Sequence, residues 1–135
     1  MMRDTEPSSW LELNPVTGHE EMLRRLAVRD DAYIDKLLAD DAANRAESRL
    51  DEKTHALAQI AALASVDAPT ASYLGAIRAA RLADASNEEI TGCLLAVLPS
   101  VGIARVVSAA PKLGLALGYD VDAALEAPAP SVSNT

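Results

Sequence analysis

Residues 50–118 read LDEKTHALAQIAALASVDAPTASYLGAIRAARLADASNEEITGCLLAVLPSVGIARVVSAAPKLGLALG. The run Ala56–Ala64 contains a single polar residue, which favours a helix that is buried on most of its sides. Asp51 precedes this run as a predicted N-cap, and Ser86 with Glu89 three residues later has the spacing of a capping box. The stretch therefore predicts a helical hairpin followed by two further helices.

The same signals extend over the rest of the chain and predict an all-α fold. Thr17 and Glu20 have capping-box spacing, and Asp67 with Pro69 supplies a cap and an early-turn proline for another helix. No segment alternates apolar and polar residues over the length of a strand. We expect about six helices, beginning at Thr17 and then running over 31–43, 51–65, 69–83, 86–98 and 101–117.

Prolines mark expected interruptions in the last two helices. Pro99 with Gly102 is expected to kink or end the helix before them, and Pro111 to break the last helix near Ala110. At 135 residues the chain fits one domain. We predict a flexible segment over 1–16, a single helical domain over 17–126 and a disordered tail over 127–135.

Composition excludes several classes of protein. The net charge of −8 lacks the basic footprint of nucleic-acid binding and argues against an anionic membrane surface. The single cysteine, Cys93, rules out an intrachain disulfide, and Met1–Ser9 lacks the apolar core of a signal peptide. We expect a cytoplasmic protein, and its alanine content and preference for arginine over lysine are typical of a bacterial one.

Three pieces of the chain together resemble the carboxymuconolactone decarboxylase family, which includes the alkylhydroperoxidase D-like (AhpD-like) proteins. The resemblance implies an AhpD-like helical bundle that forms a homo-oligomer, a trimer or a hexamer. The pieces are LDEKT at 50–54 with the apolar run after it, residues 76–90 ending in ASNEEI, and LLAVLPSVGI at 94–103.

The residues that carry the usual chemistry of that family are missing. Counting back from the ASNEEI joint places its C-x-x-C pair and histidine at Pro69, Ser72 and Ala76. Cys93 is the one thiol and His55 the last histidine, so two-cysteine peroxidase chemistry cannot occur within one chain. The Glu–His pair of the decarboxylases would fall at Ser72 and Ala76, which cannot transfer a proton at neutral pH.

Other polar residues offer a candidate catalytic site. Helices rise about 1.5 Å per residue, so Cys93 is expected level with Ala76, with Ser72 and Tyr73 one turn further along. A thiol, a hydroxyl and a phenol would then face one apolar pocket. The alternative is that Cys93 fills the core, Ser72 begins a helix, and Tyr73 is a core residue with a satisfied hydroxyl.

His55, Arg78 and Arg81 complete the candidate residues. By the same rise, His55 is expected near residues 79–82, so it would reach the pocket only across a subunit boundary. The alternative is that it is a surface or interface histidine. Arg78 and Arg81 share one side of their helix and are candidates for binding a substrate carboxylate. The alternative is that they pair with Asp84, Glu88 or Glu47.

We expect no metal and no cofactor, because the sequence has no clustered ligands and no phosphate-binding loop. Two functions remain. The first is a cofactor-free lyase or isomerase that acts on a small carboxylate or lactone-type metabolite in an apolar pocket between helices or subunits. The second is a non-catalytic family member that serves as a binding or assembly module. The expected partners are further copies of the chain and a small-molecule ligand, with no nucleic acid and no membrane.

Overall fold

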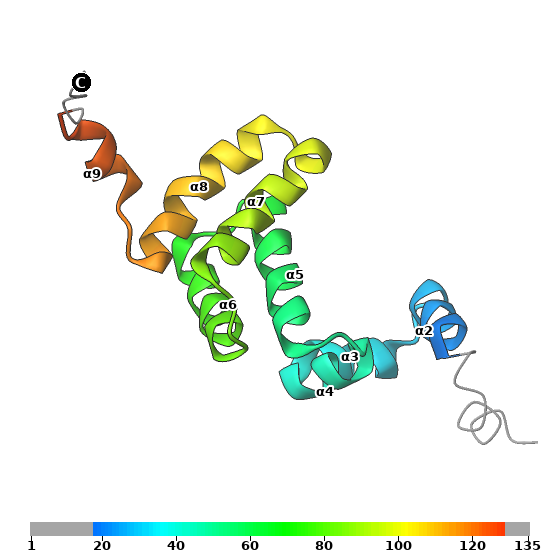
Figure 1. Ribbon diagram of the computed structural model, residues 1–135. Helices are drawn as coiled ribbons and strands as arrows, with labels where there is room; N and C mark the ends of the chain where they lie inside the picture. Colours follow the sequence, from blue (N-terminus) through cyan, green and yellow to red (C-terminus); the bar gives the residue numbers. More distant parts are fainter. Residues whose placement is uncertain (1–17, 129–135) are drawn as a thin grey trace, which may run out of the picture. The chain divides into compact units, whose positions relative to one another are not determined.

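The structure is a computed structural model and describes residues 18–128 (Figure 1). Every regular element in this range is an α-helix, which confirms the all-α prediction. The segment predicted flexible over 1–16 lies outside the described residues, as does the predicted tail 127–135 apart from its first two residues. The helices are α2 (Gly18–Ala27), α3 (Asp31–Ala39), α4 (Asp41–Ser48), α5 (Glu52–Ser65), α6 (Thr70–Leu82), α7 (Asn87–Val101), α8 (Ile103–Leu117) and α9 (Val121–Glu126).

The chain divides between Ser48 and Arg49 into two compact units, each of which is described by itself. The first unit holds α2, α3 and α4, and none of the residues in these helices is buried. The second unit holds α5 to α9 and contains the hydrophobic core. The prediction of a single helical domain over 17–126 remains a prediction.

Polar contacts connect the helices of the first unit. Glu21 accepts hydrogen bonds from Arg24 and Arg25, and these arginines lower the pKa of its carboxyl group to about 2. The Arg25 guanidinium lies 5.2 Å from the centre of the Tyr33 ring, and the Tyr33 hydroxyl donates to Glu47 at 3.1 Å. These contacts join α2 to α3 and α3 to α4.

The prediction of one helix over 31–43 is wrong, because the structure has two helices there. The first ends at Ala39, and the Asp40 carboxylate accepts from the backbone N–H groups of Ala42 and Ala43. An aspartate side chain that competes for backbone donors in this way ends one helix and caps the next.

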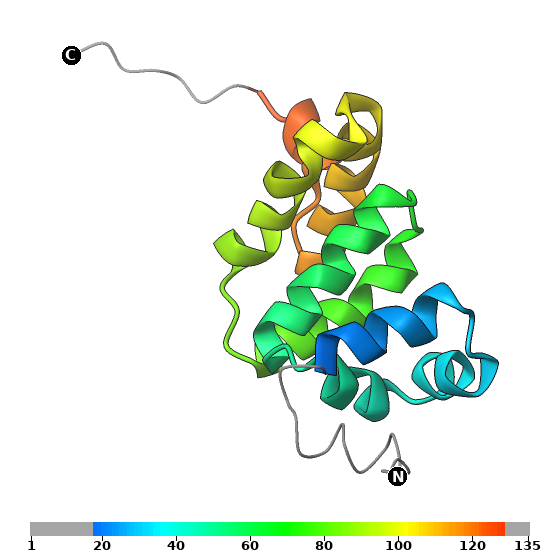
Figure 2. The same cartoon turned by 90° about the vertical axis from the view of Figure 1, so that its right-hand side faces the viewer.

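Four helices build the core of the second unit. Helix α5 packs against α6 and α7, and α8 packs against the same two helices (Figures 1 and 2). Completely buried alanines at positions 64, 80 and 109 let the helix backbones approach closely. The largest fully buried side chains come from all four helices and are Ile60, Tyr73, Ile90 and Leu113.

Helix starts in this unit follow the sequence signals with one exception. The Asp51 carboxylate accepts from the N–H of Thr54, and Ser86 with Glu89 forms the predicted capping box. Asp67, however, does not cap α6, which begins after Pro69 without a side-chain cap. Asp67 lies in the turn before it with a left-handed φ of 55°. Its side chain accepts from Ser108 and Lys112 of α8 instead.

The predicted interruption at Pro99 and Gly102 is found at Gly102, whereas the predicted break near Ala110 is wrong. Helix α7 continues through Pro99 to Val101, and Gly102, with φ 88° and ψ 166°, ends it. Helix α8 continues through Pro111, which lies between the buried residues Ala109 and Leu113. Packing on both sides of Pro111 outweighs the lost backbone hydrogen bond.

Helix α9 was not predicted from the sequence. The Asp120 carboxylate caps it by accepting from the N–H of Ala123. The chain returns to α8 at Gly114, where an added β-carbon would lie 2.8 Å from Cγ2 of Val121 and 2.9 Å from the Tyr119 carbonyl oxygen. No helix within residues 18–128 combines the length and apolar character needed to cross a bilayer.

Candidate functional site

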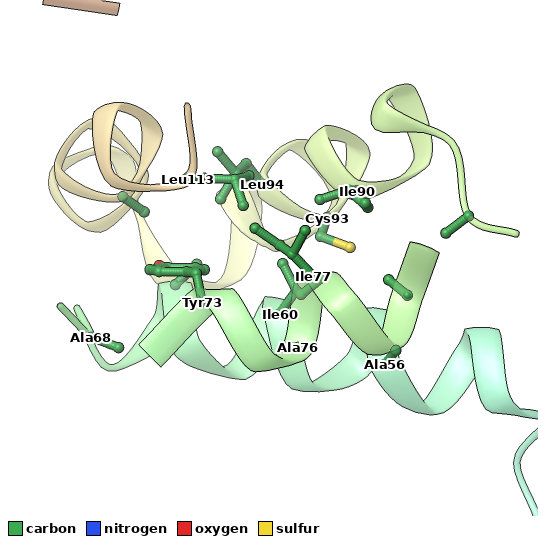
Figure 3. Close-up of a cluster of buried hydrophobic side chains, with 14 residues drawn as sticks. Ala56, Ile60, Ala68, Tyr73, Ala76, Ile77, Ile90, Cys93, Leu94 and Leu113 are labelled. Carbon is green, nitrogen blue, oxygen red and sulfur yellow. The ribbon is translucent and has the colours of Figure 1, made fainter. Parts of the chain in front are cut away.

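Tyr73 is buried at the start of α6, with none of its surface exposed. Its hydroxyl oxygen is also buried and has no hydrogen-bond partner among the described residues. Burial and, to a smaller extent, the negative charge of Asp67 raise the pKa of this phenol. Figure 3 shows the Tyr73 ring at the end of the core cluster where Ala68 lies. Tyr73 is thus a core aromatic residue with an unsatisfied polar atom.

Cys93 is 7% exposed and lies on the core side of α7. Its thiol donates towards the Leu57 and Glu89 carbonyl oxygens, at S···O distances of 3.5 and 3.6 Å. Burial raises the pKa of the thiol, which keeps it protonated at neutral pH. This is the placement of a small core residue and not that of an activated nucleophile.

The three residues proposed for one pocket do not converge. Ser72 is exposed, whereas Tyr73 beside it is buried, because consecutive residues of a helix point about 100° apart. Tyr73 and Cys93 both belong to the core cluster, but Figure 3 shows them apart, with the Cys93 sulfur pointing away from Tyr73. Within this unit no shared surface of the thiol, the hydroxyl and the phenol is formed.

His55 is 7% exposed and lies in the first turn of α5. Ala58 and Ala62, three and seven residues further on, share its side of the helix and are exposed. Ile60 and Ala64, by contrast, face the core. His55 therefore points to a different side of α5 from the one that packs against α6 and α7.

Arg78 and Arg81 are both exposed and lie three residues apart on α6. Arg81 donates to the Asn87 side chain and to the Leu117 carbonyl oxygen, each at 3.3 Å. It therefore connects the end of α6 to the start of α7 and to the end of α8. An arginine used in this way has fewer donors left for a substrate carboxylate.

Sequence reasoning missed a polar cluster at the turn between α5 and α6. Oδ1 of Asp67 accepts from the Ser108 hydroxyl at 2.7 Å and from the Lys112 ammonium at 2.8 Å. Both hydrogen bonds lower the pKa of the Asp67 carboxyl group, the one from Lys112 more than the one from Ser108. The charge of Arg105 also lowers this pKa. Asp67 and Lys112 are partly exposed, at 37% and 29% of their side-chain surfaces. The turn is thereby tied to one edge of α8.

This polar edge of α8 is formed by Arg105, Ser108 and Lys112, at i, i+3 and i+7 spacing. These three polar residues on an otherwise apolar helix were the one signal available in the sequence. Their partner Asp67 is 41 and 45 residues away, so no local pattern could identify it.

Among residues 18–128, no three histidine, cysteine or acidic side chains gather closely enough to hold a metal ion. In comparisons with family models, with curated proteins and with solved structures, nothing matches this chain. Its function has to be inferred from its own residues.

Proposed function

We propose that this chain is a divergent member of the carboxymuconolactone decarboxylase family that serves as a self-associating helical module. The helix starts at Asp51 and Ser86 support the family, because they lie at the joints on which the resemblance depends. The observation that carries the function is a largely exposed apolar surface, which we call the outer face of α8. Its members are Ile103, Ala104, Val107 and Leu115, which are exposed, and Pro111, which is half-buried.

The outer face of α8 lies beside the face that packs in the core. Ile103 is 73% exposed and Val107, one turn later, is 65% exposed, whereas Ala109 and Leu113 on the inner side are buried. A helix that is apolar on two sides is usually covered on both. Leu95 of the neighbouring helix α7 is 68% exposed and adds to the uncovered apolar surface. Exposed apolar side chains gathered on one helix face are typical of a protein interface.

The charge pattern favours a second copy of the chain as the occupant. The protein carries 20 acidic residues and a net charge of −8, yet no acidic residue occurs between Glu89 and Asp120. Elsewhere two copies repel each other, whereas two outer faces of α8 meet without any charged side chain between them. The outer face excludes Arg105 and Lys112, so it offers nothing to attract an acidic partner. An uncharged apolar surface is complementary to itself.

The test is the molar mass of the full-length protein in solution, measured by light scattering after gel filtration. We expect an oligomer for the wild type and a monomer for Val107→Asp, because a buried carboxylate would face its own symmetry mate. Leu82→Asp, at the end of α6, is the control: it adds the same charge at a 79% exposed leucine and should remain oligomeric. A monomeric wild type, or an unchanged mass for Val107→Asp, would refute the proposal.

A second candidate function is a cofactor-free lyase or isomerase acting on a small carboxylate or lactone. The buried, unpartnered Tyr73 hydroxyl favours it, because a catalytic role is one of the explanations for a buried polar atom without a partner. Release of carbon dioxide, or loss of the lactone carbonyl band, from a panel of small lactone carboxylates would detect the reaction. The rate should disappear in Tyr73→Phe, and a rate that survives this change would exclude Tyr73 from the chemistry.

A further inference from the structure

Helix α2 carries an apolar stripe that the other described helices leave largely uncovered. The stripe consists of Met22, Leu23 and Leu26, at i, i+1 and i+4 spacing on one side of the helix. Leu23 is 62% exposed and Leu26 is 52% exposed, whereas Met22 is half-buried. A helix that is apolar on one side and polar on the other is normally packed along its apolar side.

The first unit provides little apolar packing of its own. Helix α3 packs against α4, whereas α2 packs closely against none of the helices within residues 18–128. The contact of α2 with α3 is made by the Arg25 guanidinium over the Tyr33 ring, outside the stripe. Burial of apolar surface is the main favourable contribution to folding. The first unit therefore needs a further apolar segment to cover α2.

The sequence supplies such a segment directly before the helix. Trp10, Leu11 and Leu13 are three large apolar residues close together within residues 1–17, and the chain enters α2 at Gly18. They equal the stripe in number and share its apolar character.

The segment is also long enough to reach the stripe. The eight residues from Trp10 to Gly18 span up to about 26–29 Å when extended, whereas α2 rises about 12 Å from Gly18 to Leu26. The dipeptide Asn14-Pro15 favours a turn, which would let the chain reverse before the helix. A segment tethered this closely has an effective concentration in the millimolar range. It therefore has an advantage over a second copy or another protein as the occupant.

We propose that Trp10, Leu11 and Leu13 fold back onto the apolar stripe of α2 and cover it. The N-terminal segment then completes the packing of the first unit, and the stripe is closed to other proteins. The stripe belongs to the first unit and the outer face of α8 to the second. The contact is therefore independent of self-association through α8.

The test uses the fluorescence of Trp10, which is the one tryptophan of the protein. In the full-length protein we expect emission at a shorter wavelength than that of N-acetyltryptophanamide, with weaker quenching by acrylamide. The combined variant Leu23→Ser/Leu26→Ser should shift the emission to longer wavelength and increase the quenching. Leu38→Ser is the control, because it changes a 78% exposed leucine of α3 outside the stripe, and its emission should equal that of the wild type.

Three results would overturn the proposal. The first is wild-type emission and quenching equal to those of N-acetyltryptophanamide. The second is emission that does not change in Leu23→Ser/Leu26→Ser, or that changes equally in Leu38→Ser. The third is a shift to longer wavelength when the wild type is diluted, because a second copy would then supply the segment.

Hydrogen exchange gives a second readout that leaves the stripe itself unaltered. Trp10→Ser should quicken the exchange of the α2 amides, residues 18–27, and leave that of the α6 amides, residues 70–82, unchanged. Equal exchange of the α2 amides in Trp10→Ser and in the wild type would show that the segment does not cover this helix, and would also refute the proposal.

Discussion

Replacing Gly114 by alanine tests how α9 is held against α8. The new β-carbon would lie 2.8 Å from Cγ2 of Val121 and 2.9 Å from the Tyr119 carbonyl oxygen, and both distances are shorter than van der Waals contact. The Val121 side chain can move, but the Tyr119 oxygen is backbone, and the Tyr119 N–H donates to Gly114 at 2.7 Å. This overlap can be removed only if the segment that connects α8 to α9 moves away from α8.

Gly92→Ala is the matched control, because that glycine also lies within a helix and its added β-carbon would meet nothing within 4 Å. Both variants gain about 0.8–1.0 kcal/mol of helix propensity. Gly114→Ala also incurs an overpacking cost of about 1–3 kcal/mol. We expect the free energy of unfolding to rise for Gly92→Ala. For Gly114→Ala it should be about 1–3 kcal/mol lower than for Gly92→Ala, because of the overpacking cost.

Urea unfolding followed by circular dichroism measures both variants. For a domain of this size each kcal/mol changes the melting temperature by roughly 4–8 °C, so a thermal melt resolves the difference as well. Hydrogen exchange at residues 121–126 should quicken in Gly114→Ala alone. If the two alanine variants are equally stable and α9 exchanges no faster, the close approach at Gly114 does not hold this helix.

Three further predictions concern the core and the polar cluster. Ile90→Ala truncates a completely buried side chain and should lower the free energy of unfolding by about 2–5 kcal/mol in urea titrations. Lys112 lowers the pKa of Asp67, so the stability that this carboxylate contributes is present above its ordinary pKa. This stability is lost as the pH falls through the pKa of Asp67 in the folded protein. An acid unfolding titration of Asp67→Asn should lack that loss. Burial raises the pKa of Cys93, so the free energy of unfolding should fall as the pH rises from the ordinary thiol pKa through the pKa of Cys93 in the folded protein. This fall should be smaller in Cys93→Ala. Iodoacetamide should label the native protein slowly.

The helix starts could be predicted because a cap is a local interaction. Asp51 and the Ser86–Glu89 pair bond to backbone groups three residues away, and both were found as expected. The interruptions were harder to predict. Pro111 was expected to break a helix that its buried neighbours hold together, so tertiary contacts outweighed propensity there. Asp40 ends a helix that apolar spacing alone would continue, because its side chain caps the next helix.

The candidate site was less predictable than the fold. Matching helix heights placed Cys93 near Tyr73, but height along an axis does not determine which way each side chain points. Tyr73 and Cys93 both face the core, and Ser72, one residue from Tyr73, faces outward. The cluster around Asp67 was missed because it joins a turn to a helix more than 40 residues later, and because Asp67 two residues before a proline has the pattern of a cap.

The junction at Gly102 has a consequence for how this sequence can change. Its backbone, with φ 88° and ψ 166°, lies in a region that is essentially restricted to glycine. Every single-base change that replaces a glycine gives a residue with a β-carbon or a stop. No single-base replacement of Gly102 therefore preserves the angle at which α8 leaves α7. Both helices can accumulate substitutions along their lengths, while the residue between them has no one-step alternative.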